Sequence, residues 1–209
     1  METHENEIAW SKKQRSLKLA LTTFFILSLL LLSPAVSFAH CDTMDGPVIK
    51  DARIAIEKNK PAYILKWVHP ENEAELRDAF ILAMKVRKLG PDAEALADKY
   101  FFETLIRLHR SGEGVPYTGI KPAGTPVEEK ILAADRSIET GSLSPLKGKV
   151  AAGMLPELTE RFEKVMELKN FDVSNVKAGR EYVEAYVRFF KFAEGETEEH
   201  GNEHHAHAE

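Results

Sequence analysis

The sequence has a single cysteine and no excess of basic residues. Cys41 is the only cysteine among 209 residues, so no disulfide can form within the chain. Lysine and arginine together number 28 against 33 aspartate and glutamate residues, and no basic stripe is interleaved with aromatic residues. A protein that binds nucleic acid needs positive charge to neutralise phosphates. We therefore expect no nucleic-acid partner.

The signatures of several enzyme classes and of β-structure are also absent. No alternation of apolar and polar residues with a period of two persists, which argues against strands. The sequence has no Gly-x-Ser-x-Gly, no Walker phosphate loop and no His-Glu-x-x-His. A di-iron bundle needs Glu-x-x-His pairs on its helices, and the predicted helices contain none. The sequence thus names no reaction or substrate, and leaves open whether the protein is an enzyme.

One long apolar run is present near the N-terminus. Residues 19–32 (LALTTFFILSLLLL) follow a basic stretch and are short for a bilayer span, which needs about 20 residues. Pro34 breaks the helix, and Ser37 and Ala39 stand at the −3 and −1 positions of a signal-peptidase site. We expect residues 1–39 to be a signal peptide, and the protein to be periplasmic or secreted.

Two alternatives to cleavage after Ala39 remain open. An uncleaved segment would anchor the chain in the membrane. A lipoprotein would carry its lipid on Cys41, although His40 then occupies a position that normally holds a small residue. No other membrane contact is expected.

The remaining chain has helical periodicity and is long enough for one core. We expect an all-α fold, a single bundle of about five to seven helices over residues 40–195, followed by a disordered, His-rich acidic tail over residues 196–209. The expected helices cover 47–59, 71–88, 92–110, 126–139 and 174–194, with a short apolar segment from Pro61 and a helical stretch from Ser144 that breaks near Pro156.

The helix expected over residues 92–110 leads into a long loop. Its inner stripe by spacing comprises Leu96, Tyr100, Thr104, Leu105 and Leu108. His109 points away from Tyr100, so we read it as a histidine at the loop edge. Residues 111–126 (SGEGVPYTGIKPAGTP) hold four glycines and three prolines and cannot be helical. A loop of this length is either a binding or lid segment or a connector outside the bundle.

The pair His40-Cys41 directly follows the expected cleavage site. Processing after Ala39 would give the mature chain four donors in two residues: the terminal amine, the His40 imidazole, the Cys41 backbone nitrogen and its thiolate. Adjacent amine, amide and thiolate donors close five-membered chelate rings, which favour a square-planar ion such as nickel or copper. The alternative is that the pair has no function.

The hook His40-Cys41-Asp42, with Gly46 in register, resembles the processed N-terminus of nickel superoxide dismutases. The resemblance covers about a dozen residues and implies a helical bundle with His40 and Cys41 as metal ligands. The second cysteine ligand of that family falls on Asp45 here, so Asp45 is a substitute ligand at most. Without the second thiolate, the resemblance does not imply dismutase activity.

Most of the remaining chain resembles a bacterial family of uncharacterised exported helical proteins. The shared stretches are HCDTMDGPV, YFFETL, GEGVPYTG and GREYVEAYV. That family has no established activity, so the resemblance implies only the domain.

Histidines in the tail extend the metal-binding hypothesis. His200, His204, His205 and His207 form a tract of a kind that binds zinc, nickel or copper loosely, or they are simply solvated. We therefore expect an exported protein that chelates nickel or copper through His40-Cys41, with redox activity as a further branch. The alternative is a non-catalytic envelope protein that binds a partner through loop 111–126. A homo-oligomer stays open in both cases.

Overall fold

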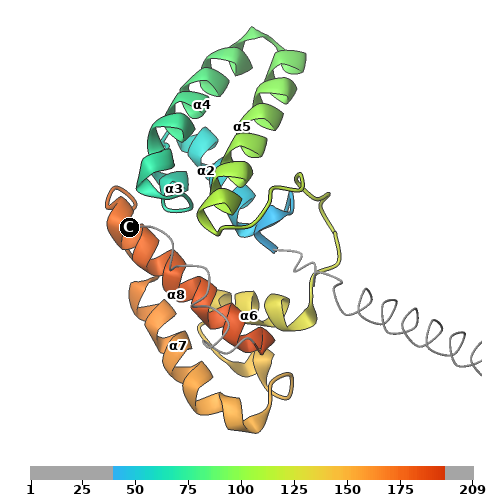
Figure 1. The fold of residues 1–209 in the computed structure, drawn as a ribbon, viewed down its shortest axis with the longest axis vertical. Coiled ribbons are helices and arrows are strands. Elements are labelled where there is room, and N and C mark those ends of the chain that lie inside the picture. The colour runs from blue at the N-terminus through green and yellow to red at the C-terminus, as the bar shows by residue number, and fades with distance from the viewer. Residues whose placement is uncertain (1–39, 196–209) are drawn as a thin grey trace, which may run out of the picture. The chain divides into compact units, whose positions relative to one another are not determined.

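The structure is a computed structural model, and it describes residues 40–195. Within that range it contains seven α-helices and no β-strand, which confirms the expected all-α bundle (Figure 1). The expected signal peptide (1–39) and tail (196–209) lie outside the described residues. The helices are α2 (Pro47–Lys58), α3 (Ala62–Leu65), α4 (Glu73–Val86), α5 (Pro91–Gly112), α6 (Glu129–Thr140), α7 (Leu155–Leu168) and α8 (Val176–Glu194), and the 3-10 turns are η1 (His40–Asp42), η2 (Pro70–Asn72), η3 (Arg87–Leu89), η4 (Ser144–Leu146) and η5 (Ala152–Met154).

Helix ends mostly follow the residues that punctuate the sequence. Asn59 and Gly141 adopt left-handed backbone angles and end α2 and α6. The break expected near Pro156 is the start of α7, since a proline in the first turn removes only an N–H group that would lack a helical partner. None of the helices in the described range is long and apolar enough to cross a membrane.

Two expected helix starts were wrong. The helix expected from Pro126 begins at Glu129 instead, because the Thr125 hydroxyl donates to the Pro122 carbonyl at 2.7 Å rather than capping α6. Ser144-Pro145 opens a single 3-10 turn and no longer helix. In both places the side-chain hydroxyl closes a local turn: Ser142 and Ser144 share a hydrogen bond of 2.9 Å.

The helices form two groups along the chain. In the N-terminal half (residues 40–112), α4 and α5 are antiparallel neighbours, and α2 packs against α3 and α5 (Figure 1). In the C-terminal half (residues 129–195), α8 packs against both α6 and α7. One cluster of buried apolar side chains runs through both halves and includes Phe101, Leu158 and Phe189.

Arg180 on α8 ties the two halves together. Its guanidinium donates to the carbonyl oxygens of Val68 (3.0 Å) and Leu65 (3.3 Å) at the end of α3, and to Glu73 on α4 (2.6 Å). These bonds join α8 to the segment that follows α3 and to α4.

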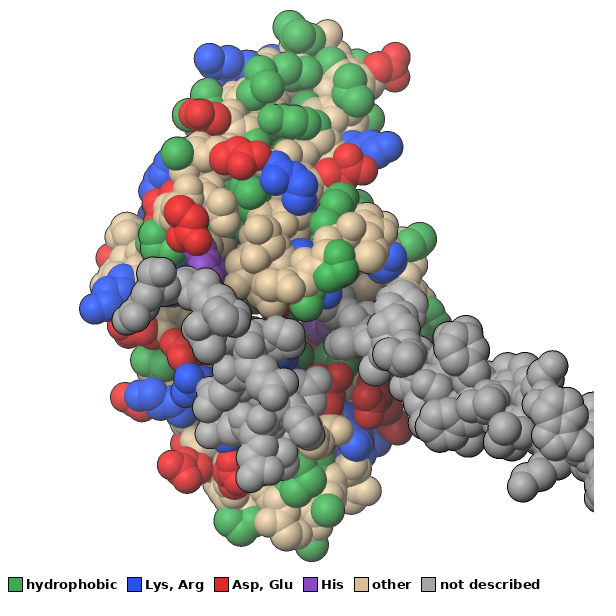
Figure 2. All heavy atoms as spheres, in the orientation of Figure 1, with side chains coloured by type: hydrophobic (Ala, Val, Ile, Leu, Met, Phe, Trp, Pro, Cys, Tyr) green, Lys and Arg blue, Asp and Glu red, His purple; other side chains and the backbone are tan. Residues whose placement is uncertain are grey.

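The core-facing residues expected on α5 were correct in its C-terminal part and wrong in its N-terminal part. Leu105 and Leu108 are buried as expected, whereas Leu96 and Tyr100 are exposed. Within residues 40–195, the outer part of α5 packs on α4 and η3, and the side that carries Leu96 and Tyr100 is exposed. Figure 2 shows hydrophobic side chains gathered over these two helices.

Candidate functional site

The segment His40–Gly46 folds back on itself before α2 begins. The Thr43 hydroxyl donates to the His40 carbonyl at 3.2 Å, and the Gly46 N–H donates to the Thr43 carbonyl at 2.9 Å. A Cβ atom at position 46 would lie 2.3 Å from the His40 carbonyl oxygen. Only glycine permits that approach, so Gly46 fixes the path by which His40 and Cys41 enter the protein interior.

His40 is held by residues of the C-terminal half. Its Nε2 atom bonds a carboxylate oxygen of Asp135 on α6, and the Tyr186 hydroxyl on α8 donates to the other oxygen of Asp135 at 2.7 Å. With Nε2 donating to the carboxylate, the neutral imidazole keeps a lone pair on Nδ1. That Nδ1 atom is buried and has no hydrogen-bond partner among the described residues. A buried nitrogen without a partner is costly and needs an explanation.

The Cys41 thiol, on the next residue of the chain, is only 2% exposed. Burial raises the pKa of the thiol, and the neighbouring carboxylates of Glu113, Asp42 and Asp135 raise it further. A neutral, buried thiol is a poor nucleophile. Burial thus shields this lone cysteine from solvent and from the thiols of other chains.

A second layer of polar side chains closes the site from α5. His109 is 4% exposed, so its expected place at the loop edge was wrong. Its Nδ1–H donates to the Trp67 carbonyl at 2.9 Å, and its Nε2 lies 3.6 Å from a Glu113 oxygen. Arg110 bridges Glu113 (2.7 Å) and Asp42 (3.4 Å). One guanidinium, that of Arg110, therefore faces two carboxylates.

The long loop covers the His40–Asp45 segment. The Lys121 N–H donates to the Asp42 carbonyl at 2.8 Å, and the Met44 N–H donates to the Lys121 carbonyl at 3.0 Å. Asp45 accepts a bond of 3.0 Å from the Gly124 N–H, which lowers the pKa of its carboxyl group. The loop is therefore held against the site through its backbone.

The residues predicted as metal ligands fall in three places. His40 and Cys41 are neighbours inside the site. Asp45 is exposed, and its carboxylate contacts the loop. His200, His204, His205 and His207 lie outside the described residues. Within residues 40–195, no three side chains of His, Cys, Asp or Glu are grouped so that they could hold a metal ion.

Three residues of the site were not predicted from the sequence as site residues: Asp135, Glu113 and Arg110. Asp135 gave a readable signal, because it lies on the same helical face as Ile131 and Ile138, which are both buried. A carboxylate in an apolar stripe is a candidate for a specific bond. Glu113 and Arg110 gave no such signal beside the loop.

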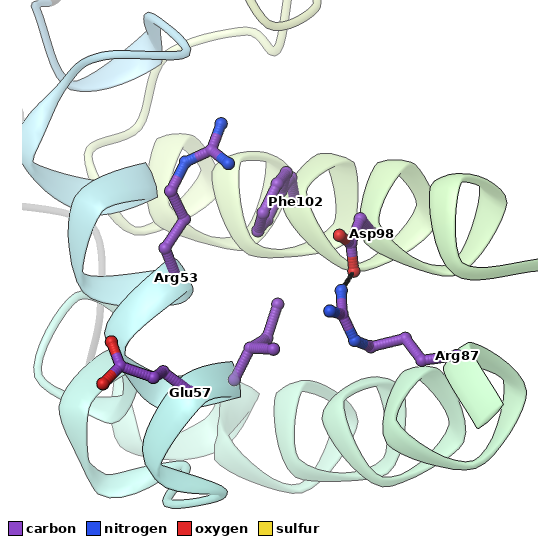
Figure 3. Close-up of a pocket in the computed structure, with 6 residues that line it drawn as sticks. Arg53, Glu57, Arg87, Asp98 and Phe102 are labelled. Carbon is purple, nitrogen blue, oxygen red and sulfur yellow. Dashed lines mark hydrogen bonds and ion pairs between the residues drawn. The ribbon is translucent and has the colours of Figure 1, made fainter. Parts of the chain in front are cut away.

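A pocket of about 320 Å³ lies elsewhere, between α2 and α5 (Figure 3). Phe102 forms its apolar floor, and the Arg53 guanidinium lies over that ring, 5.3 Å from its centroid. Arg87 is paired with Asp98 and with Glu94 (2.5 Å). The pocket shares no residue with the His40–Cys41 site. Because Arg87 is already paired with carboxylates, the pocket offers a ligand fewer unpaired polar groups than that site does.

Comparison with known proteins places the chain in a family. Residues 45–192 match a family of unknown function (DUF6448), and the chain belongs to that family. The match begins at Asp45, so it does not include His40 or Cys41. No curated protein and no solved structure matches the chain.

Proposed function

We propose that this member of the DUF6448 family is an exported protein whose processed N-terminus binds nickel or copper through His40 and Cys41. The observation that carries the proposal is the buried, unpartnered Nδ1 atom of His40, on the residue that precedes the buried Cys41. A histidine that binds a metal through one nitrogen usually donates its other N–H to a carboxylate. The bond from His40 to Asp135, itself fixed by Tyr186, has that form.

The donor set fits a hook better than a site built only from side chains. Cleavage after Ala39 would add a terminal amine next to Nδ1, and the amide nitrogen and thiolate of Cys41 complete the set. A bound nickel or copper ion would supply Lewis acidity and a redox couple.

The proposal stops at metal binding. The likeness to the nickel superoxide dismutase hook offers Asp45 at the position of the second cysteine, and the Asp45 carboxylate is engaged by Gly124. A bound metal would therefore have a single thiolate ligand, that of Cys41, and we do not extend the proposal to redox catalysis. The histidine tract of the tail, His200 to His207, would supply a second, looser site.

The first experiment is the intact mass and N-terminal sequence of the protein, expressed complete and purified without a reductant. A chain that begins at His40 without lipid has the amine that the hook requires. A chain that begins at Met1, or that carries lipid on Cys41, contradicts the proposal.

Nickel and copper titrations then test the ligands in protein that lacks residues 196–209, so that the tail does not contribute. We expect Cys41→Ser to remove the thiolate-to-metal absorption band and tight binding. Asp135→Asn should weaken binding by about tenfold to a hundredfold, as changes behind metal-bound histidines do. His69→Gln, which alters an exposed histidine, is the matched control. Equal affinity in wild type and Cys41→Ser would instead favour the alternative, a non-catalytic protein that binds a partner through loop 111–126.

A further inference from the structure

An exposed apolar face runs along the α4–α5 hairpin, away from the His40–Cys41 site. Its four large side chains keep between 45% and 78% of their surface exposed: Leu82 (49%), Leu89 (78%), Leu96 (67%) and Tyr100 (45%). Scattered exposed leucines are ordinary, so the question is whether these side chains lie together.

The register of the two helices answers it. Glu75 on α4 and Arg107 on α5 form an ion pair, which fixes one level of the antiparallel pair. Two helical turns are about seven residues. Counting seven residues from Glu75 toward the hairpin tip reaches Leu82, and counting seven back from Arg107 reaches Tyr100, so these two side chains lie at the same level. Three turns bring Val86 level with Leu96. These apolar side chains therefore lie on the same face of the hairpin.

Charged residues flank this face in a pattern that changes sign along the hairpin. Asp78 and Glu103 lie on the side toward Glu75, and Lys85 and Lys99 lie on the side toward the tip. All four are exposed. None of them forms an ion pair with another residue in the range 40–195. Along the hairpin, Leu82 and Tyr100 lie between the two acidic residues and the two basic residues.

We propose that this face is the interface of a homodimer in which two α4–α5 hairpins pack antiparallel as a four-helix bundle. A two-fold axis that crosses the hairpin at Leu82 and Tyr100 sets α4 against α4 and α5 against α5. It brings Asp78 opposite Lys85 of the second copy, and Lys99 opposite Glu103. An isologous interface requires this kind of self-complementary surface.

Other occupants fit the face less well. The chain's own tail, residues 196–209, has no large apolar side chain with which to cover it. An anionic membrane would attract Lys85 and Lys99, but it would repel Asp78 and Glu103 on the same face. A second copy satisfies both signs of charge and the apolar centre together.

Sedimentation equilibrium tests the dimer, with the complete chain expressed and purified in the form that the cell produces. We expect a monomer–dimer equilibrium, and Leu96→Glu should raise its dissociation constant by about a hundredfold, since it buries charge at the centre of the interface. Leu132→Glu is the matched control, because Leu132 is 50% exposed on α6 and lies outside this face. Because both leucines are exposed, neither substitution should unfold the protein. Far-UV circular dichroism of each variant checks this.

Charge reversal tests the antiparallel arrangement. Lys99→Glu and Glu103→Lys should each weaken the dimer by about tenfold, because like charges would then meet across the interface. The double variant restores opposite charges and should recover most of the wild-type affinity. This recovery distinguishes the dimer from membrane binding, where the two reversals would act in opposite directions.

Three outcomes would overturn the inference. They are a monomer at every concentration, equal effects of Leu96→Glu and Leu132→Glu, and no recovery in the double variant. Cosedimentation of a monomeric protein with anionic vesicles would assign the face to a membrane instead. The measurement is independent of metal binding, so either proposal can fail alone.

Discussion

At the scale of single residues, the Tyr186 hydroxyl is the group that fixes Asp135. Tyr186→Phe leaves one oxygen of a partly buried carboxylate without its donor, which costs roughly 1–3 kcal/mol. We expect the lower part of that range, because Asp135 keeps some contact with water. Urea unfolding measures the loss. Tyr182→Phe on the same helix is the control, since the Tyr182 hydroxyl makes no hydrogen bond within the described residues. Equal losses would show that Asp135 does not depend on Tyr186.

The same scale shows why some site residues could be predicted and others could not. His40 and Cys41 are adjacent, so their chelating pattern is visible in the sequence. The bond between His40 and Asp135 spans 95 positions and depends on how the two halves pack. His109 was placed on the outer side because it points away from Tyr100. Tyr100 itself proved to be exposed, so the opposite side of α5 is the core.

At the scale of elements, Gly46 determines how the His40–Asp42 turn joins α2. Its backbone angles are ordinary (φ −73°), so the constraint is space and not conformation. Gly46→Ala would place a Cβ atom 2.3 Å from a backbone oxygen, and we expect a loss of about 1–3 kcal/mol, as for other overpacked sites.

Thermal and urea unfolding of Gly46→Ala, with Gly153→Ala as a matched control, check this prediction. A Cβ atom at Gly153 has no neighbour within 4 Å, so that substitution should be close to neutral. A Gly46→Ala protein as stable as Gly153→Ala would show that the turn relaxes easily and does not fix the site.

Elements were predictable wherever one local signal dominated. Proline and left-handed residues set the ends of α2 and α7 as the sequence indicates, because these effects act within a single turn. The start of α6 was not predictable, since the Thr125 hydroxyl bonds the Pro122 carbonyl and does not cap a helix. The apolar residues Leu96 and Tyr100 were assigned to the core, because helical spacing does not show which side of α5 the other helices of residues 40–195 cover.

At the scale of the whole molecule, the two halves are joined by a charge pair as well as by the core. Glu73 on α4 accepts a bond from Arg180 on α8, and this bond lowers the pKa of the Glu73 carboxyl below its ordinary value of 4.5. A carboxyl group whose pKa is lower in the folded state stabilises the fold above the unfolded-state pKa. That contribution is lost as the pH falls through the folded-state pKa.

We therefore expect Glu73→Gln to reduce the free energy of unfolding by about 1 kcal/mol at pH 7, a modest value because the pair is partly exposed. As the pH falls below 4.5 and through the folded-state pKa of Glu73, the difference should shrink, since wild-type Glu73 is then increasingly protonated as well. Urea titrations at several pH values measure both effects. Glu157→Gln is the control, because Glu157 pairs with Arg161 within α7 alone and does not join the halves. A Glu73→Gln loss that persists unchanged at low pH would mean that packing, and not the charge on Glu73, holds the halves together at this contact.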